Sequence, residues 1–223
     1  MDLFSGLPGR SNRKEPDRTM RRSLPILALV ASAASAHALN LITNGSFEVG
    51  TNPGGTFISL SAGDSTSIPG WVVGGGGIDY IGGYWNAQDG VRSVDLSRTS
   101  AGSISQTIAT SVGQQYLLGF WLAANPDLPS STPATKVAIV SAGNVINQTF
   151  TTPPRGTRTN MNWGYYSLVF TAQATSTTIL FQSGENNAVG PALDNVSVEA
   201  VPEPATLALA GLGLATALRR RKR

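Results

Sequence analysis

Residues 115–123 read QYLLGFWLA, and this stretch decides the fold class. Every second residue is large and apolar and faces the same side of an extended chain: Tyr116, Leu118, Phe120 and Leu122. Leu117 and Trp121 fall on the opposite side. An apolar period of two is the signature of a β-strand, whereas a helix would repeat its apolar residues at spacings of three and four.

Similar runs recur on both sides of this stretch, between clusters of Gly, Pro, Asn and Ser. They are SISQTI (103–108), KVAIV (136–140), YYSLVFT (165–171), TTILFQ (177–182) and NVSVEAV (195–201). No long run has a helical period, and we expect about eight to ten strands without helical partners. The sequence therefore predicts an all-β jelly-roll β-sandwich over residues 39–200.

Three stretches within this body look like loops. Residues 72–90 (VVGGGGIDYIGGYWNAQDG) hold four consecutive glycines and a cluster of aromatic residues. Residues 125–135 and 151–162 are rich in Pro, Ser and Thr. Residues of these types favour turns, so we expect all three stretches to connect strands.

Charge is unevenly distributed along the chain. The whole sequence has a net charge of +3, but six basic residues lie at or before Arg22 and five more form the last five positions. Between Leu39 and Pro204 there are five basic and ten acidic side chains, a net charge of −5. An acidic body is not expected to bind nucleic acid, whose phosphates require a basic surface.

The chain has no cysteine and one histidine, His37. Without cysteine there is no disulfide framework, thiol nucleophile or thiolate zinc site. His37 falls in a segment that we expect to be removed, so the mature body would also lack imidazole for activating a nucleophile. Carboxylate chemistry and oxygen-ligand calcium binding remain open.

The N-terminal region has the features of a secretory signal peptide over residues 20–38. Arg21 and Arg22 are followed by a short apolar run, and Ala36 and Ala38 form a small-x-small cleavage motif. We expect cleavage after Ala38. Residues 1–19 are polar and cannot form a core, so they are either an over-extended start, with Met20 as the true first residue, or a disordered segment.

The C-terminal residues 201–223 read VPEPATLALAGLGLATALRRRKR. The uncharged stretch 205–218 would form about 21 Å of helix, which is short for a hydrocarbon core of about 30 Å. Together, Pro202-Glu203-Pro204, this transmembrane segment and the basic block resemble a PEP-CTERM sorting signal. The resemblance implies an exosortase-type membrane protease that cuts near the motif and a transient stay in the inner membrane. It also implies export to the surface or matrix of a Gram-negative bacterium that makes exopolysaccharide or biofilm.

The body also resembles a known family, the bacterial choice-of-anchor C proteins. Five segments carry the resemblance in order: NLITNGSFEVG (40–50), PGWVV (69–73), DYIGGYWNAQDGVRSVDLS (79–97), GSISQTIATSVGQQYLLGFWLAANP (102–126) and GPALDNVSVEAVPEP (190–204). The resemblance implies a galactose-binding-like jelly roll, related in pattern to carbohydrate-binding modules and without catalytic activity. Such modules often hold a structural calcium ion.

Two sets of candidate site residues follow. If NGSFE is the first strand and ALDNVSV the last, Glu48 and Asp194 approach each other. They could then hold calcium, with Asn44 as a contributor or a turn former, or simply accept hydrogen bonds from backbone groups. Tyr80, Tyr84 and Trp85 could present their rings to a sugar, or fill the end of the sandwich.

Three functions are consistent with these features. The first is a surface or matrix protein that binds a glycan, including the cell's own exopolysaccharide. The second is a structural surface protein with protein contacts only. The third is a glycan hydrolase that uses Glu48 and Asp194 as its carboxylate pair.

Overall fold

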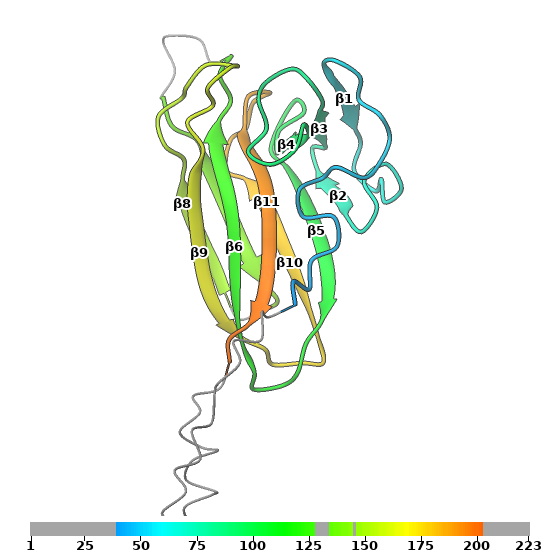
Figure 1. Cartoon of the computed structure of the whole chain (residues 1–223), viewed down its shortest axis with the longest axis vertical. Coiled ribbons are helices and arrows are strands. Elements are labelled where there is room, and N and C mark those ends of the chain that lie inside the picture. The colour runs from blue at the N-terminus through cyan, green and yellow to red at the C-terminus, as the bar shows by residue number, and fades with distance from the viewer. Residues whose placement is uncertain (1–38, 128–133, 145, 203–223) are drawn as a thin grey trace, which may run out of the picture. The chain divides into compact units, whose positions relative to one another are not determined.

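The computed structural model describes residues 39–127, 134–144 and 146–202, and these residues form eleven β-strands and no helix (Figure 1). All strand pairs are antiparallel. One sheet has six strands in the order β1 (Phe57–Leu60), β3 (Ile78–Ile81), β4 (Ser93–Asp95), β11 (Pro191–Ala200), β6 (Gln115–Ala124) and β9 (Gly164–Thr171). The other has five, in the order β2 (Val72–Gly75), β5 (Gly102–Ala109), β10 (Ser176–Ser183), β7 (Val137–Ala142) and β8 (Ile146–Thr151). The prediction of an all-β sandwich is confirmed.

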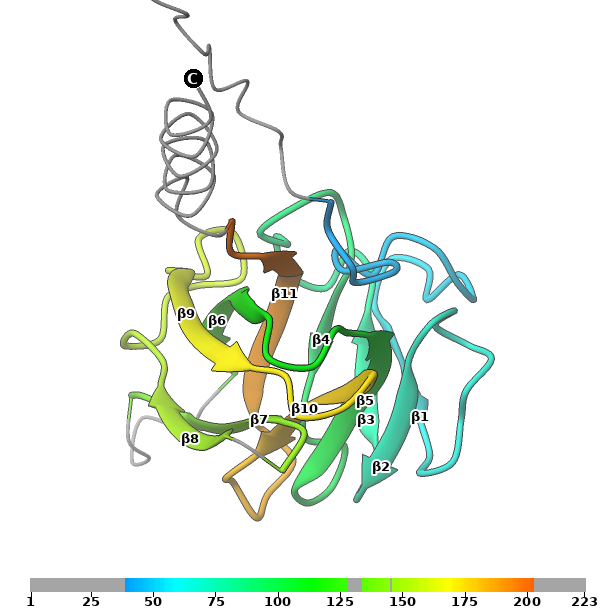
Figure 2. The same cartoon turned by 90° about the horizontal axis from the view of Figure 1, so that it is seen from below.

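The two sheets form two layers with the hydrophobic core between them (Figure 2). Alternate residues of each strand point into this core, as Leu118, Phe120 and Leu122 do on β6. Phe120 contacts Phe181 of the opposite sheet edge to face, with ring centroids 5.1 Å apart. Such aromatic pairs add to the burial of apolar area that stabilises a sandwich.

The alternating runs of the sequence correspond to β5, β6, β7, β9, β10 and β11, as predicted. The stretch NGSFE, expected to be the first strand, is instead a turn before β1. Asn44 and Phe47 have φ angles of 54° and 60°, a left-handed conformation that interrupts the extended backbone of a strand. Phe47 is fully buried all the same, because the turn directs its ring into the core.

The glycine-rich stretch 72–90, expected to be a loop, contains two strands. Its first residues form β2 of the five-stranded sheet, and residues 78–81 form β3 of the six-stranded sheet. Gly75, the last residue of β2, and Gly77, in the connection that crosses between the sheets, have φ angles of 58° and 88°. Glycine adopts these angles without the steric penalty that side chains incur, so the run permits a sharp crossing rather than a long loop.

The last strand ends where the sorting motif begins. The backbone N–H of Val201 donates to Gln115 O at 2.9 Å, and Pro202 is exposed. Near the start of the described chain, Asn40 Oδ1 accepts from Val198 N at 2.9 Å, which ties this segment to β11. The expected cleavage residues Ala36 and Ala38, the tail helix, Glu203 and Pro204 lie outside the described residues. Within those residues, no helix is long and apolar enough to cross a membrane.

Candidate functional site

The outer face of the six-stranded sheet carries the acidic side chains of the strands. On β3, Tyr80 points into the core and Asp79 points outward. Asp79 lies opposite Asp95 of β4, and on β11 Asp194 lies opposite Trp121. Strand alternation therefore gathers carboxylates and aromatic rings on this face, while the core side remains apolar.

Two of the predicted site residues hold one loop, residues 82–92, which lies between β3 and β4. Asp194 Oδ2 accepts hydrogen bonds from Gln88 N at 2.7 Å and Asp89 N at 3.0 Å. Glu48 Oε1 accepts from the backbone N–H groups of residues 91 and 92 at 2.9 and 2.7 Å. Both acids thus contact the same loop, and in the structure they accept hydrogen bonds from its backbone groups.

This arrangement does not suit calcium. A calcium site needs several oxygen ligands converging on one point. Here Asp194 also accepts from Asn195 N through Oδ1, so both of its oxygens face N–H donors, as Glu48 Oε1 does. Asn44 is a turn former, since its side chain bonds the backbone of Val49. Within the described chain, no three acidic or histidine side chains are grouped closely enough to hold a metal ion.

The three predicted ligand rings have different environments. Tyr80 is fully buried, with its hydroxyl bonded to Phe47 O, and so does not present its ring to a surface ligand. Trp85 is 4% exposed and packs over Ile81, while its Nε1 donates to Ser93 Oγ at 2.9 Å. Both rings are buried, Tyr80 in the core between the sheets and Trp85 in a separate, smaller apolar cluster that includes Ile81. Tyr84 is only partly buried.

Tyr84 contributes to a small cavity of about 110 Å³ at one end of this face. The cavity is lined by three rings, those of Phe57, Tyr84 and Trp85, and by aliphatic and polar side chains. The polar lining consists of Asp79, Asp95, Asn125 and Asp127. Rings beside groups that bind hydroxyls are typical of small-molecule sites.

Burial raises the pKa of Asp95 to about 7, and the nearby Asp79 carboxylate adds to the rise. Hydrogen bonds from Asn125 Nδ2 at 2.7 Å and from the backbone of Ser97 and Gly190 act in the opposite direction. Desolvation outweighs these donors because Asp95 is 2% exposed. The cavity thus contains a carboxyl group that changes charge near neutral pH.

Arg158 fixes the position of Tyr84. Its guanidinium group lies 4.0 Å from the centre of the Tyr84 ring and forms two hydrogen bonds to Asp127, of 2.9 and 2.8 Å. The Tyr84 hydroxyl donates to Asp127, and this bond is the main cause of the raised pKa of Tyr84. A bidentate ion pair orients both partners, so the ring is held at the rim of the cavity.

A second aromatic feature lies on the same face, on β6 and β9. Trp121 and Tyr165 lie directly opposite each other, with ring centroids 5.5 Å apart and planes inclined by 59°. Tyr165 is 52% exposed, and Trp121 is partly exposed. A Cβ atom at Gly119 would lie 2.6 Å from the Tyr165 hydroxyl, so the glycine lets this ring lie across the strand.

This ring pair was not among the predicted ligand residues. The alternation in QYLLGFWLA places Trp121 on the face that points away from the core. The same period of two places Tyr165 and Tyr166 on different faces of their strand. Pairing between β6 and β9, which brings the two rings together, cannot be read from either strand alone. An outward aromatic residue on each of two strands was the available signal.

Comparison with known proteins gives one match for the sandwich and another for the tail. The family described as "Protein of unknown function (DUF642)" matches residues 40–199. The chain belongs to the DUF642 family. Its residues 200–222 match the PEP-CTERM protein-sorting motif, as the tail predicted, which indicates an exported protein of the cell surface or extracellular space. The choice-of-anchor C resemblance remains a prediction.

One curated relative of this DUF642 protein is Halomucin of Haloquadratum walsbyi. The two are 32% identical over 178 residues, which are 77% of this chain and 2% of Halomucin. The chain thus spans a very small part of that relative's length. A search of solved structures finds TmCBM61, determined in complex with β-1,4-galactotriose, at a TM-score of 0.50 and 17% identity. That match covers 74% of this chain and all of TmCBM61, and at this identity it supports the fold.

Proposed function

We propose that this DUF642 protein is a non-catalytic carbohydrate-binding protein of the cell surface or extracellular matrix. The observation that carries the proposal is the exposed pair of Trp121 and Tyr165 on the outer face of the six-stranded sheet. The C–H faces of a pyranose ring are apolar, and aromatic rings that are exposed in water gain free energy when such a face covers them.

The same face supplies polar groups for sugar hydroxyls. Ser167 and Ser197 lie on either side of Gly119, next to the ring pair. Gln88 and Asn195, bonded to each other at 2.8 Å, lie beside Asp194, the residue opposite Trp121. Hydroxyl and amide groups both donate and accept hydrogen bonds, as sugar hydroxyls do. The end cavity with Phe57 and Tyr84 offers a further position for a sugar on this face.

Binding without catalysis is favoured over hydrolysis by the roles of the two candidate acids. A glycosidase needs two carboxyl groups free to reach one glycosidic bond. Glu48 and Asp194 instead accept backbone hydrogen bonds from the loop 82–92. Their carboxylates hold the loop beside the face, so their contribution to binding is the position of the loop.

The sorting motif supports the rest of the proposal. The tail matches the PEP-CTERM protein-sorting motif. On this basis the proposal includes processing by an exosortase-type membrane protease, after a transient stay in the inner membrane of a Gram-negative bacterium. The glycan available at the destination is the exopolysaccharide or another cell-surface glycan. An exposed ring pair suits a protein that attaches to such a glycan.

A glycan array probed with the full-length chain and its ring variants tests this function. Trp121→Ala and Tyr165→Ala should each weaken binding by about tenfold or more, because a central aromatic contact carries much of a binding free energy. Tyr165→Phe retains the ring and should retain binding. Val72→Ala, at an exposed site on the other sheet, is the matched control. A folded chain that binds no glycan on the array would instead indicate a structural protein with protein contacts only.

A further inference from the structure

The five-stranded sheet contains no charged residue in any of its strands. The six-stranded sheet, in contrast, carries Asp79, Asp95, Asp194 and Glu199. The outer face of the five-stranded sheet is formed mainly by hydroxyl, amide and small aliphatic side chains, among them Ser105, Thr107 and Thr149. In a body with a net negative charge, this face is a neutral hydrogen-bonding surface.

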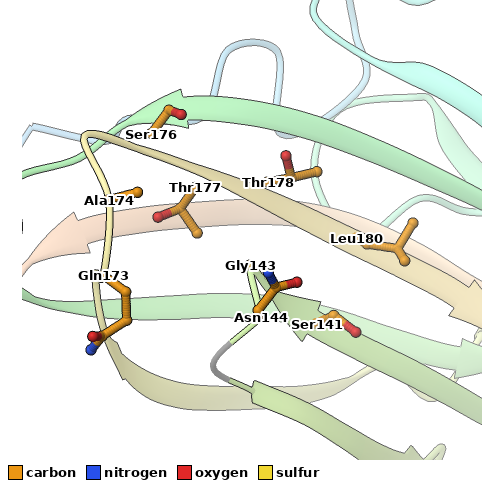
Figure 3. A pocket seen from close by; sticks show the side chains of 9 residues that line it. All are labelled: Ser141, Gly143, Asn144, Gln173, Ala174, Ser176, Thr177, Thr178 and Leu180. Carbon is orange, nitrogen blue, oxygen red and sulfur yellow. The ribbon is translucent and has the colours of Figure 1, made fainter.

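A hollow of about 600 Å³ lies at one end of this sheet (Figure 3). It lies where the connection between β7 and β8 and the turn between β9 and β10 meet the first residues of β10. Its lining consists mostly of residues with hydroxyl or amide groups, with a few aliphatic ones, and six of these residues carry the argument. These are Ser141, Ser176, Thr178, Asn144, Gln173 and Leu180.

The chemistry of the lining selects the class of ligand. Hydroxyl and amide groups donate and accept hydrogen bonds, but none of them neutralises an ionic charge. A charged ligand would lose hydration here without gaining a partner of opposite charge. A neutral, polyhydroxylated ligand could bond the polar groups while its apolar face contacts Leu180. The volume falls within the range of about 300–1,000 Å³ that is usual for small-molecule sites.

The polar groups are available for such a ligand. Gln173 Nε2 donates to Thr171 O at 3.4 Å, a long bond that a better acceptor would replace. Asn144 and Gln173 are exposed turn residues, on separate connections. Thr178, which also lines the hollow, bonds Thr107 across the strands at 2.8 Å.

A second copy of the chain is a less suitable occupant. Two identical faces associate stably when projections on one fill recesses on the other. The outward side chains of this face are small or medium in size, such as Thr107, Ile139 and Gln182, and none is aromatic. No side chain from this sheet face would therefore fill a hollow of this size in a partner.

We infer that this hollow is a second carbohydrate site, specific for neutral oligosaccharides and separate from the ring-bearing face of the proposed function. The two sites lie on opposite sheets. One chain could therefore join two glycan strands. When many chains bind along the same polysaccharide, the two sites together would raise the effective affinity for a matrix. Acidic oligosaccharides are expected to be excluded from the hollow.

Backbone amide NMR of the full-length chain, titrated with three neutral trisaccharides, tests the inference: β-1,4-galactotriose, cellotriose and mannotriose. At least one should shift the amide signals of Ser141, Asn144 and Gln173, whereas trigalacturonate should not. The double variant Asn144→Ala/Gln173→Ala should weaken this binding about tenfold, since it removes two hydrogen-bonding amides. The matched control is Asn147→Ala/Gln182→Ala, which removes an exposed Asn and an exposed Gln from the same sheet outside the hollow.

Three results would overturn the inference. They are the absence of shifts at the hollow with every trisaccharide, equal weakening in the control variant, and a dimer in light scattering that the Asn144/Gln173 variant abolishes. Trp121→Ala separates the two proposals, because it removes the ring pair and leaves the hollow intact. If a trisaccharide shifts only signals near Trp121, the proposed function holds and the second site does not.

Discussion

At the residue scale, the burial of Asp95 makes the charge in the end cavity depend on pH. The carboxyl group is 2% exposed, and its pKa is raised to about 7. Because the folded-state pKa lies above that of the unfolded chain, the protonated form favours folding. This contribution is fully present below about pH 4 and is lost as the pH rises through about 7. Asp194, with a pKa also raised to about 7 by burial, acts in the same direction.

A carbon-detected NMR titration of the side-chain carboxyl groups tests this at the residue scale. Asp95 should titrate with a midpoint near 7, because desolvation penalises its charged form. Asp64 is the internal control, since hydrogen bonds from Ser67 lower its pKa below the ordinary value. Its midpoint should lie below that of an ordinary aspartate in the same spectra. A midpoint for Asp95 in the ordinary range of about 4 would show that its three donors outweigh burial.

At the scale of elements, the loop 82–92 is held by two acids, Asp194 at residues 88 and 89 and Glu48 at residues 91 and 92. Gly90 approaches Glu48 so closely that a Cβ atom there would lie 2.4 Å from the carboxyl carbon. Its φ of 67° also favours glycine. Glu48 and Asp194 therefore replace the strand pairing that the loop lacks, and they position Trp85 and Gln88 over the sheet.

Glu48→Ala tests this support directly. It leaves the N–H groups of Val91 and Arg92 without their acceptor, so the free energy of unfolding should fall by about 1–3 kcal/mol. Hydrogen exchange at these two amides should accelerate, whereas exchange in β6 should change little. Glu199→Ala removes the same side chain from an exposed position on β11 and should change stability by less than about 0.5 kcal/mol. Unchanged exchange at residues 91 and 92 would mean that Glu48 does not hold the loop.

The elements also show which parts of the sequence could be read in advance. Strand β6 was predictable because alternation over its length is a local property. The turn around Phe47 was not, since an apolar residue at positive φ looks like part of a strand in sequence. Tyr80 and Trp85 were open to two interpretations, because a ring beside a glycine run suits both a surface and a core. Only the pairing of β3 with β4 determines that Tyr80 points inward.

At the scale of the whole sandwich, charge divides the two outer faces. Acidic side chains and exposed rings lie on the six-stranded sheet, and the strands of the five-stranded sheet are uncharged. The body's negative charge disfavours close contact with acidic polymers at the first face, whereas the second face adds no charge. This asymmetry follows from strand order, since β5, β10 and β7 are distant in sequence but adjacent in the sheet.

Both predicted processing sites adjoin residues that are bonded to strands of the six-stranded sheet. Asn40 bonds Val198, and Val201 bonds Gln115, so cuts after Ala38 and near Pro202 would leave these contacts intact. Mass spectrometry of the protein secreted by its own host should therefore find a first residue of Leu39 and a last residue within positions 202–204. The same protein expressed in a host without an exosortase-type protease serves as the control and should keep its tail. A secreted form that retains Arg223 would exclude removal of the sorting signal, and a first residue beyond Asn40 would show that the tie to β11 is dispensable.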